Sequence, residues 1–160
     1  EIKNLIEKIR NAGDVAIRST FIVGFPGETD EQYQKLYDFI GEYKLNYAGF
    51  FAYSKEDGTA AAKLKNQIPQ AVKNKRLKNI TALQSKVIFE NNKNYVGKSL
   101  KVLYEGIDYD NNIFYGRPEF CAPEVDAKVL FSSDNLVNVG NFYDVKITGA
   151  NGYDLVGEVK

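Results

Sequence analysis

The stretch RSTFIVGFPGET, residues Arg18–Thr29, decides the fold of the first half of this chain. Its residues 21–23 are aromatic and β-branched, which predicts a strand buried on both faces. Gly24 and Gly27 then permit unusual backbone angles, and Pro26 stiffens the turn between them. An acidic residue and a threonine follow and open a helix. Because α/β proteins bind ligands where a parallel strand gives way to a helix, the turn is a candidate ligand site. A strand-to-helix connection without a ligand is the alternative.

Helical and strand patterns alternate around this stretch. Apolar residues at helical spacing predict a first helix that ends near Gly13, and a second over residues 30–43. Strand patterns cover residues 15–25 and 47–53. The order helix, strand, helix, strand argues for a parallel sheet or part of a (β/α) barrel. A polar loop over residues 54–67 leads to a long helix.

The long helix begins at Pro69 and reaches about Asn94, with a broken apolar stripe. Its basic residues predict a solvated face, with a nucleic-acid contact as the alternative, because the chain is neutral overall. These residues are Lys73, Lys75, Arg76, Lys78, Lys86 and Lys93.

The pattern changes near Val96. Five short strand-like runs follow within 65 residues and predict a small closed barrel of the oligonucleotide-binding kind. Residues 1–95 hold 15 Lys and Arg against 11 Asp and Glu, whereas residues 96–160 hold 6 against 10. This shift in charge favours two domains, residues 1–95 and 96–160.

Composition excludes several kinds of site. The 160 residues include no histidine and a single cysteine, Cys121. An internal disulfide, a multi-cysteine metal site and any Ser-His-Asp or Cys-His scheme are therefore excluded within this chain. We expect neither a membrane span nor a signal peptide, and we expect a cytoplasmic location. The first residue is not methionine, which we interpret as the mark of a fragment of a longer protein.

Four segments together carry a family resemblance. They are RSTFIVGFPGETDEQYQKLYDFI at Arg18–Ile40, FAYSKEDGTAAAKL at Phe51–Leu64, YGRPEFCAPEVDA at Tyr115–Ala127 and VKITGANGYDLVGEV at Val145–Val159. Their order and spacing resemble the RimO-type branch of the radical-SAM methylthiotransferases. The resemblance implies an α/β fold: the C-terminal part of a radical-SAM partial (β/α) barrel, then a five-stranded OB-like β-barrel called a TRAM domain.

The same resemblance implies a transferase that methylthiolates an aspartate on protein 12 of the small ribosomal subunit. The family uses S-adenosylmethionine (SAM) and two 4Fe-4S clusters, one of them held by a CxxxCxxC motif. This chain lacks that motif. Without the thiolates there is no cluster to deliver an electron, so we expect no metal site, no catalytic residue and no activity in this chain alone.

The resemblance also assigns candidate binding residues. Strand residues Arg18 and Thr20 are expected to point into the barrel toward SAM, Arg18 toward a carboxylate. A structural ion pair is the alternative for Arg18, and core packing is the alternative for Phe51. The complete cofactor set is Arg18, Thr20, Gly24, Phe25, Pro26, Gly27, Phe51 and Tyr53. The candidate substrate-binding residues are Ser54, Gly58, Thr59 and Arg117. A surface loop without contacts is the alternative for Gly58 and Thr59.

Charge separates the candidate partners. An RNA-binding barrel should be basic, whereas residues 96–160 are acidic and suit a basic ribosomal protein. Nucleic acid is thus not the favoured partner. A tRNA-adenosine methylthiotransferase with an RNA-binding TRAM domain is the alternative function, and a non-catalytic binding module is the second. Within the barrel, the alternative for Arg117 is an internal salt bridge.

Overall fold

The computed structural model describes residues 1–159, which form two compact units. Residues Arg18–Ile88 make up one, here called the sheet unit. Residues Glu1–Ile17 and the chain from Phe89 onward make up the other, here called the barrel unit. The domain division at residues 95 and 96 stays a prediction.

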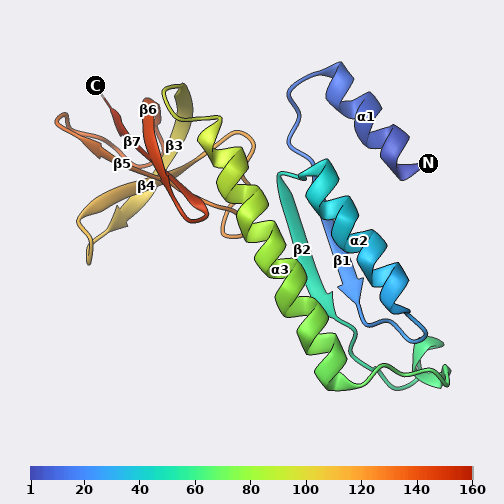
Figure 1. The fold of residues 1–160 in the computed structure, drawn as a ribbon. Helices are drawn as coiled ribbons and strands as arrows, with labels where there is room; N and C mark the ends of the chain where they lie inside the picture. The colour runs from blue at the N-terminus through green and yellow to red at the C-terminus, as the bar shows by residue number, and fades with distance from the viewer. Residues whose placement is uncertain (160) are drawn as a thin grey trace. The chain divides into compact units, whose positions relative to one another are not determined.

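The sheet unit contains two parallel strands and two long helices (Figure 1). In chain order these are β1 (Arg18–Val23), α2 (Asp30–Tyr43), β2 (Tyr47–Ala52), the short 3-10 helix η1 (Ala61–Lys63) and α3 (Gln70–Lys93), whose last residues enter the barrel unit. Strands β1 and β2 pair in parallel along all six residues. Thr29 caps α2 through a reciprocal pair of hydrogen bonds with Gln32, which fixes where the helix begins.

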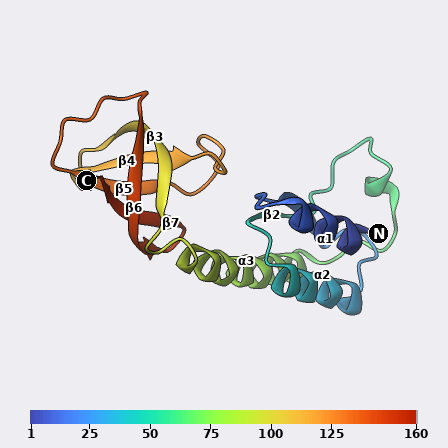
Figure 2. The same ribbon diagram turned by 90° about the horizontal axis from the view of Figure 1, so that it is seen from above.

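Within the sheet unit, the helices cover one face of the β1–β2 sheet. Phe21 packs on Phe39 of α2, with ring centroids 6.2 Å apart, and stacks on Phe50 of β2. Figure 2 shows α2 and α3 on the same side of β2. On the other face, Ile22 is 54% exposed. The expectation of a strand buried on both faces is therefore wrong, because within the sheet unit both helices pack on the same side.

The barrel unit contains α1 (Ile2–Ala12) and a closed five-stranded barrel. The strands are β3 (Ser99–Asp108), β4 (Ile113–Pro118), β5 (Val129–Ser133), β6 (Phe142–Asn151) and β7 (Asp154–Val159). They close in the order β3-β4-β5-β7-β6, with β5 and β7 parallel and every other neighbouring pair antiparallel. The predicted small closed barrel is confirmed.

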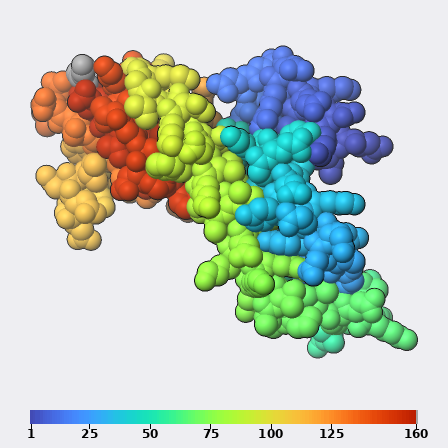
Figure 3. Space-filling model, viewed as in Figure 1, coloured from blue at the N-terminus to red at the C-terminus, as the bar shows by residue number. Residues whose placement is uncertain are grey.

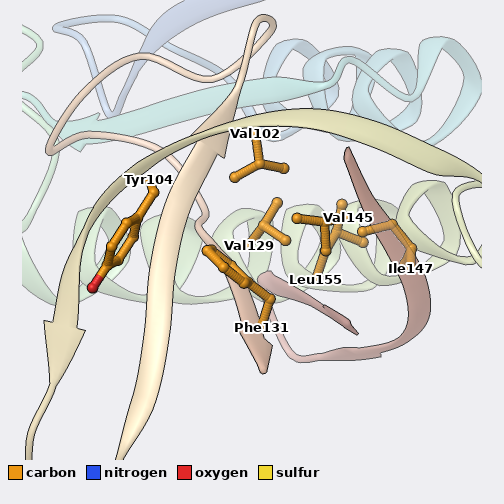
Figure 4. Packing of buried hydrophobic residues seen from close by; sticks show 7 residues of the cluster. All are labelled: Val102, Tyr104, Val129, Phe131, Val145, Ile147 and Leu155. Atoms are coloured by element: carbon orange, nitrogen blue, oxygen red, sulfur yellow. The ribbon is translucent and has the colours of Figure 1, made fainter. Parts of the chain in front are cut away.

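The barrel core consists of alternate residues of the strands, as period-two patterning requires. Its buried side chains meet inside the barrel (Figure 4) and are Val102, Tyr104, Val129, Phe131, Val145, Ile147 and Leu155. Strands β3 and β6 are longer than their predicted runs because pairing continues past an irregularity in each.

Among residues 1–159 no helix combines the length and the apolar character that a membrane span requires.

Candidate functional site

The turn after β1 is closed by a hydrogen bond to the side-chain carboxylate of Glu28. Gly24 and Gly27 adopt left-handed φ angles of 73° and 87°. The backbone amide of Gly24 donates a 2.8 Å hydrogen bond to Oε1 of Glu28. The amide of Glu28 donates back to the carbonyl of Phe25 at 2.9 Å, and that of Gly27 to Asn66 at 2.7 Å. The chain from Gly24 to Glu28 is thus a fixed loop at the carboxyl end of β1.

Arg76 of α3 forms ion pairs with two carboxylates, one in this loop and one at the start of α2. Its Nη1 lies 2.5 Å from Oε1 of Glu28, and its Nη2 lies 2.6 Å from Oδ1 of Asp30. The side chains of Arg76 and Glu28 are 7% and 12% exposed. Burial alone would lower the pKa of Arg76. The hydrogen bond that Arg76 donates to Asp30 and the negative charge of Glu28 outweigh burial and raise the pKa of Arg76. The Arg76 guanidinium therefore stays charged and pairs with both carboxylates near the start of α2.

A second basic residue of α3 reaches the end of β2. Lys73 Nζ donates a 2.8 Å hydrogen bond to the carbonyl of Tyr53, and the ammonium lies 5.6 Å from the centre of the Tyr53 ring. The lysine stem passes against Gly24: a Cβ at that glycine would lie 2.3 Å from Lys73 Cγ. Only glycine leaves room for this passage. Phe25 meets the Tyr53 ring edge-on at 5.3 Å.

The structure therefore corrects one expectation about α3. Lys73 and Arg76 are buried, three residues apart on the helix face that meets β2 and the turn. Of the basic residues expected on a solvated face, only the other four are exposed, namely Lys75, Lys78, Lys86 and Lys93. Sequence reasoning also missed the role of Glu28. The available signal was an acidic residue four positions after Gly24, beside a helix start.

The exposed face of the sheet carries the predicted strand residues. Because side chains alternate along a strand, Arg18, Thr20 and Ile22 of β1 share this face. The parallel register sets Ile22 beside Phe51, which is 63% exposed. Thr20 Oγ1 lies 3.7 Å from where a Cβ of its register partner Gly49 would stand. The Arg18 guanidinium lies over the ring of Tyr47 at 5.0 Å. Apolar and hydrogen-bonding groups thus lie side by side here.

The predicted cofactor residues divide by burial. Arg18, Thr20, Phe25, Gly27 and Phe51 are exposed. The remaining three, Gly24, Pro26 and Tyr53, are buried. The buried hydroxyl of Tyr53 has no hydrogen-bond partner in the described part of the chain.

The predicted substrate residues of the polar loop gather around one glutamate. Ser54 Oγ donates to Oε1 of Glu56 at 3.0 Å, and Thr59 Oγ1 donates to the Glu56 carbonyl at 2.8 Å. Gly58 between them has a left-handed φ of 84°. All four residues are exposed. The loop is therefore ordered by its own side chains, and its tip is open to solvent.

Arg117 lies in the barrel unit, on β4. Its Nε donates to Oε1 of Glu105 on β3 at 2.7 Å, and both side chains are nearly three-quarters buried. The structure thus contains the internal salt bridge that was the alternative for Arg117. A substrate contact at Arg117 stays a prediction. Cys121 is buried near the end of β4.

Comparison with known proteins assigns the barrel to a known domain family. Residues 96–159 match the TRAM domain family. The match covers all five strands of the barrel.

Near its full length the chain is similar to curated proteins named ribosomal protein uS12 methylthiotransferase RimO. The protein from Alkaliphilus oremlandii is 46% identical over 160 residues, which is 99% of this chain and 36% of the relative. The proteins from Thermoanaerobacter sp. and Acetivibrio thermocellus are 40% and 38% identical, again over 99% of this chain, and 36% and 35% of their own length is covered. The predicted resemblance to the RimO-type branch is confirmed. The chain spans about a third of the length of these relatives.

Proposed function

We propose that this chain is part of a radical-SAM methylthiotransferase of the RimO type, acting on an aspartate of ribosomal protein uS12 in the cytoplasm. The observation that carries the proposal is the 46% identity to such a protein over 99% of the chain. In this proposal the sheet unit supplies part of the SAM site, and the TRAM barrel recognises the substrate.

The residues of the exposed sheet face suit SAM. Ile22 and Phe51 form an adjacent apolar surface for the adenine ring, and Thr20 offers a hydroxyl beside it. Arg18 carries the guanidinium that a carboxylate binds with two parallel hydrogen bonds. A Cβ built on Gly27 meets nothing within 4 Å, so its backbone is open to close approach by a ligand.

The chain's own residues act by binding and positioning. SAM supplies the radical chemistry when it is bound. The Glu28–Arg76 ion pair holds the Gly24–Gly27 turn in one conformation before any ligand arrives. A fixed turn avoids the entropy cost of ordering on binding. We assign the buried Gly24, Pro26 and Tyr53 to support of this turn, and Phe25 and Gly27 to its exposed edge.

This chain does not contain the cysteine ligands that bind the family's iron–sulfur clusters. Residues 1–159 contain no group of three or more His, Cys, Asp or Glu side chains placed to hold a metal ion. The whole sequence holds one cysteine, against the three thiolates that a radical-SAM cluster needs. In our proposal both clusters are held by other parts of the enzyme, and Ser54, Gly58 and Thr59 border the substrate entrance.

A chimera tests the proposal. The segment of the Alkaliphilus oremlandii relative that aligns with this chain is replaced by this chain, and the clusters are reconstituted under anaerobic conditions. We expect methylthiolation of uS12, detected by mass spectrometry of the modified peptide. Thr20→Val and Phe51→Ser should weaken equilibrium binding of SAM, whereas Lys78→Ala on the exposed face of α3 should not.

Two results would overturn this proposal. One is a folded, cluster-loaded chimera that leaves uS12 unmodified. The other is a chimera that modifies tRNA instead, which would transfer the chain to the tRNA-modifying branch.

A further inference from the structure

A groove with a volume of about 270 Å³ lies between α2 and α3 in the sheet unit. Its lining includes Tyr33, Gln34 and Tyr37 from α2, and Asn79, Leu83 and Lys86 from α3. Figure 3 shows the two helices side by side at the surface. Both helices cover the same face of the sheet, so the groove lies on the side away from the exposed face that we assign to SAM.

Two tyrosine rings form one wall of this groove. The ring centroids of Tyr33 and Tyr37 lie 6.2 Å apart, and both side chains are half-buried. The Tyr33 hydroxyl donates a 3.0 Å hydrogen bond to the Arg76 carbonyl, and the Arg76 guanidinium lies 5.4 Å from the centre of the Tyr33 ring. Tyr33 is therefore fixed beside Tyr37. The groove volume is near the lower end for small-molecule pockets, about 300 Å³, so it suits one flat ring such as a nucleobase.

The α3 side of the groove is basic. Residues 70–89 contain five Lys and Arg and no Asp or Glu. Two of the five, Lys73 and Arg76, are buried against the end of β2 and the turn. The other three are exposed, namely Lys75, Lys78 and Lys86. Among residues 1–159 none of these three ammonium groups forms an ion pair.

The three exposed lysines lie along one side of α3. Lys78 and Lys86 follow Lys75 by three and eleven residues, which are spacings that return to the same side of a helix with 3.6 residues per turn. At the rise of an α-helix the row extends for about 16 Å. A stacked nucleic-acid strand carries a phosphate about every 3.4 Å along its axis. The row therefore suits a strand better than a single nucleotide.

Two carboxylates of α2 lie near the groove, but neither lines it. Asp30 pairs with Arg76, with Oδ1 2.6 Å from Nη2. Oδ1 of Asp38 accepts a 2.7 Å hydrogen bond from Nε2 of Gln34, which holds that amide in place at the groove. Lys86 is the one charged side chain among the described residues that line the groove, so a ligand there meets positive charge.

We propose that the α2–α3 groove binds single-stranded RNA, with a base stacked on Tyr37, the adjacent phosphate on Lys86 and further phosphates on the other two exposed lysines. A basic track beside stacking aromatic rings is how proteins bind single strands. The lysines of α3 have no aromatic residues between them on their own stretch of helix, and α2 supplies the rings instead. Gln34 and Asn79 offer amides to the edge of the base. This inference goes beyond the proposed function and does not depend on it.

Fluorescence anisotropy tests the groove. A labelled single-stranded RNA of mixed sequence and about 12 nucleotides is titrated with the 160-residue chain at two salt concentrations. Tyr37→Leu should weaken binding at least about fivefold and leave its salt dependence unchanged, because it removes stacking and no charge. Lys86→Gln should weaken binding about three- to fivefold and lower the slope of log affinity against log salt by about 0.7, because one phosphate contact is lost.

Matched controls separate the groove from unspecific attraction. Lys35→Gln removes one exposed positive charge from α2, two residues from Tyr33 and so on the opposite side of that helix. Tyr109→Leu removes a ring that is 85% exposed in the barrel unit. Both variants should bind within about twofold of the wild type, and so should Tyr37→Phe, which keeps the ring. Lys86 is exposed, so Lys86→Gln tests the groove even where Tyr37→Leu alters helix packing.

Several outcomes would overturn the RNA site. They are no binding by the wild-type chain, wild-type affinity in both Tyr37→Leu and Lys86→Gln, and equal losses in Lys35→Gln and Lys86→Gln. Binding of duplex RNA or of free AMP as tightly as the strand would also overturn it, because a duplex hides its bases and AMP cannot meet the lysine row.

The chimera described above reports separately on the proposed function. If it modifies uS12 while the wild-type chain fails to bind the RNA, the groove is wrong and the proposed function stands. If the groove variants behave as expected while the chimera leaves uS12 unmodified, the proposed function fails and the RNA site stands.

Discussion

Nη1 of Arg76 and Oε1 of Glu28, 48 residues apart in sequence, lie 2.5 Å apart in a largely buried ion pair. The same carboxylate oxygen accepts the amide of Gly24. The pair thereby joins α3, the start of α2 and the turn that follows β1.

Arg76→Met should destabilise the chain by about 3 kcal/mol, because it leaves the Glu28 carboxylate buried without its partner. Urea unfolding followed by circular dichroism measures the loss. Lys75→Met, on the exposed face of the same helix, is the control and should change the free energy of unfolding by less than about 0.5 kcal/mol. Equal effects of the two variants would show that the ion pair does not hold the turn.

Gly24→Ala should cost about 2–4 kcal/mol, since a Cβ there meets the Lys73 stem and the φ angle of 73° strains any other residue. Gly27→Ala has the same sign of φ but open space, so about 1 kcal/mol of strain is expected. Thermal unfolding compares the two. Lys73→Ala combined with Gly24→Ala should lose less than the sum of the single losses, and additivity would contradict the contact.

Arg117→Gln separates a structural role from a binding role. Its ion pair with Glu105 is partly exposed, so stability should fall by no more than about 1 kcal/mol. If Arg117 contacts the substrate, as predicted, affinity for uS12 should fall at least about fivefold in the same variant. Glu105→Gln removes the same ion pair without removing the guanidinium and serves as the control. Unchanged affinity in Arg117→Gln would restrict Arg117 to the salt bridge.

Tyr33 gives a pH-dependent prediction. Its hydroxyl donates a 3.0 Å hydrogen bond to the Arg76 carbonyl, and burial raises its pKa above the ordinary value of 10.0. The folded chain thus prefers the neutral phenol. That contribution is complete below pH 10.0 and is lost as pH rises through the folded pKa. The stability difference between wild type and Tyr33→Phe should therefore shrink above pH 10.0. A difference that stays constant would contradict this sign.

The chain alone should remain without a cluster after anaerobic incubation with iron and sulfide, because it holds one cysteine. Iron analysis and the visible absorbance of the desalted chain measure this. The chimera, treated in parallel, is the positive control. Stoichiometric iron in the isolated chain would contradict the expectation that it is inactive by itself.

Local sequence was sufficient for the bounds of most helices and strands. Helix α2 begins and ends as predicted because Thr29 caps it and the apolar stripe stops with it. The barrel was predictable from five alternating runs, although β3 and β6 extend further because partner strands continue to pair with them. The candidate site was predicted only in part. Glycines predict a turn, but local sequence does not show which distant side chain occupies the space beside a glycine.

The sequence by itself determined the strand-to-helix turn, the barrel and the absence of the cluster cysteines, since these follow from residue type, spacing and count. Only the tertiary structure decided that Lys73 and Arg76 are buried while Lys75 and Lys78 of the same helix are exposed. It also decided that Ile22 and Phe51 lie side by side on an open face. The physical reason is that charge and hydrophobicity belong to single residues, whereas burial depends on which segments, distant in sequence, pack against them.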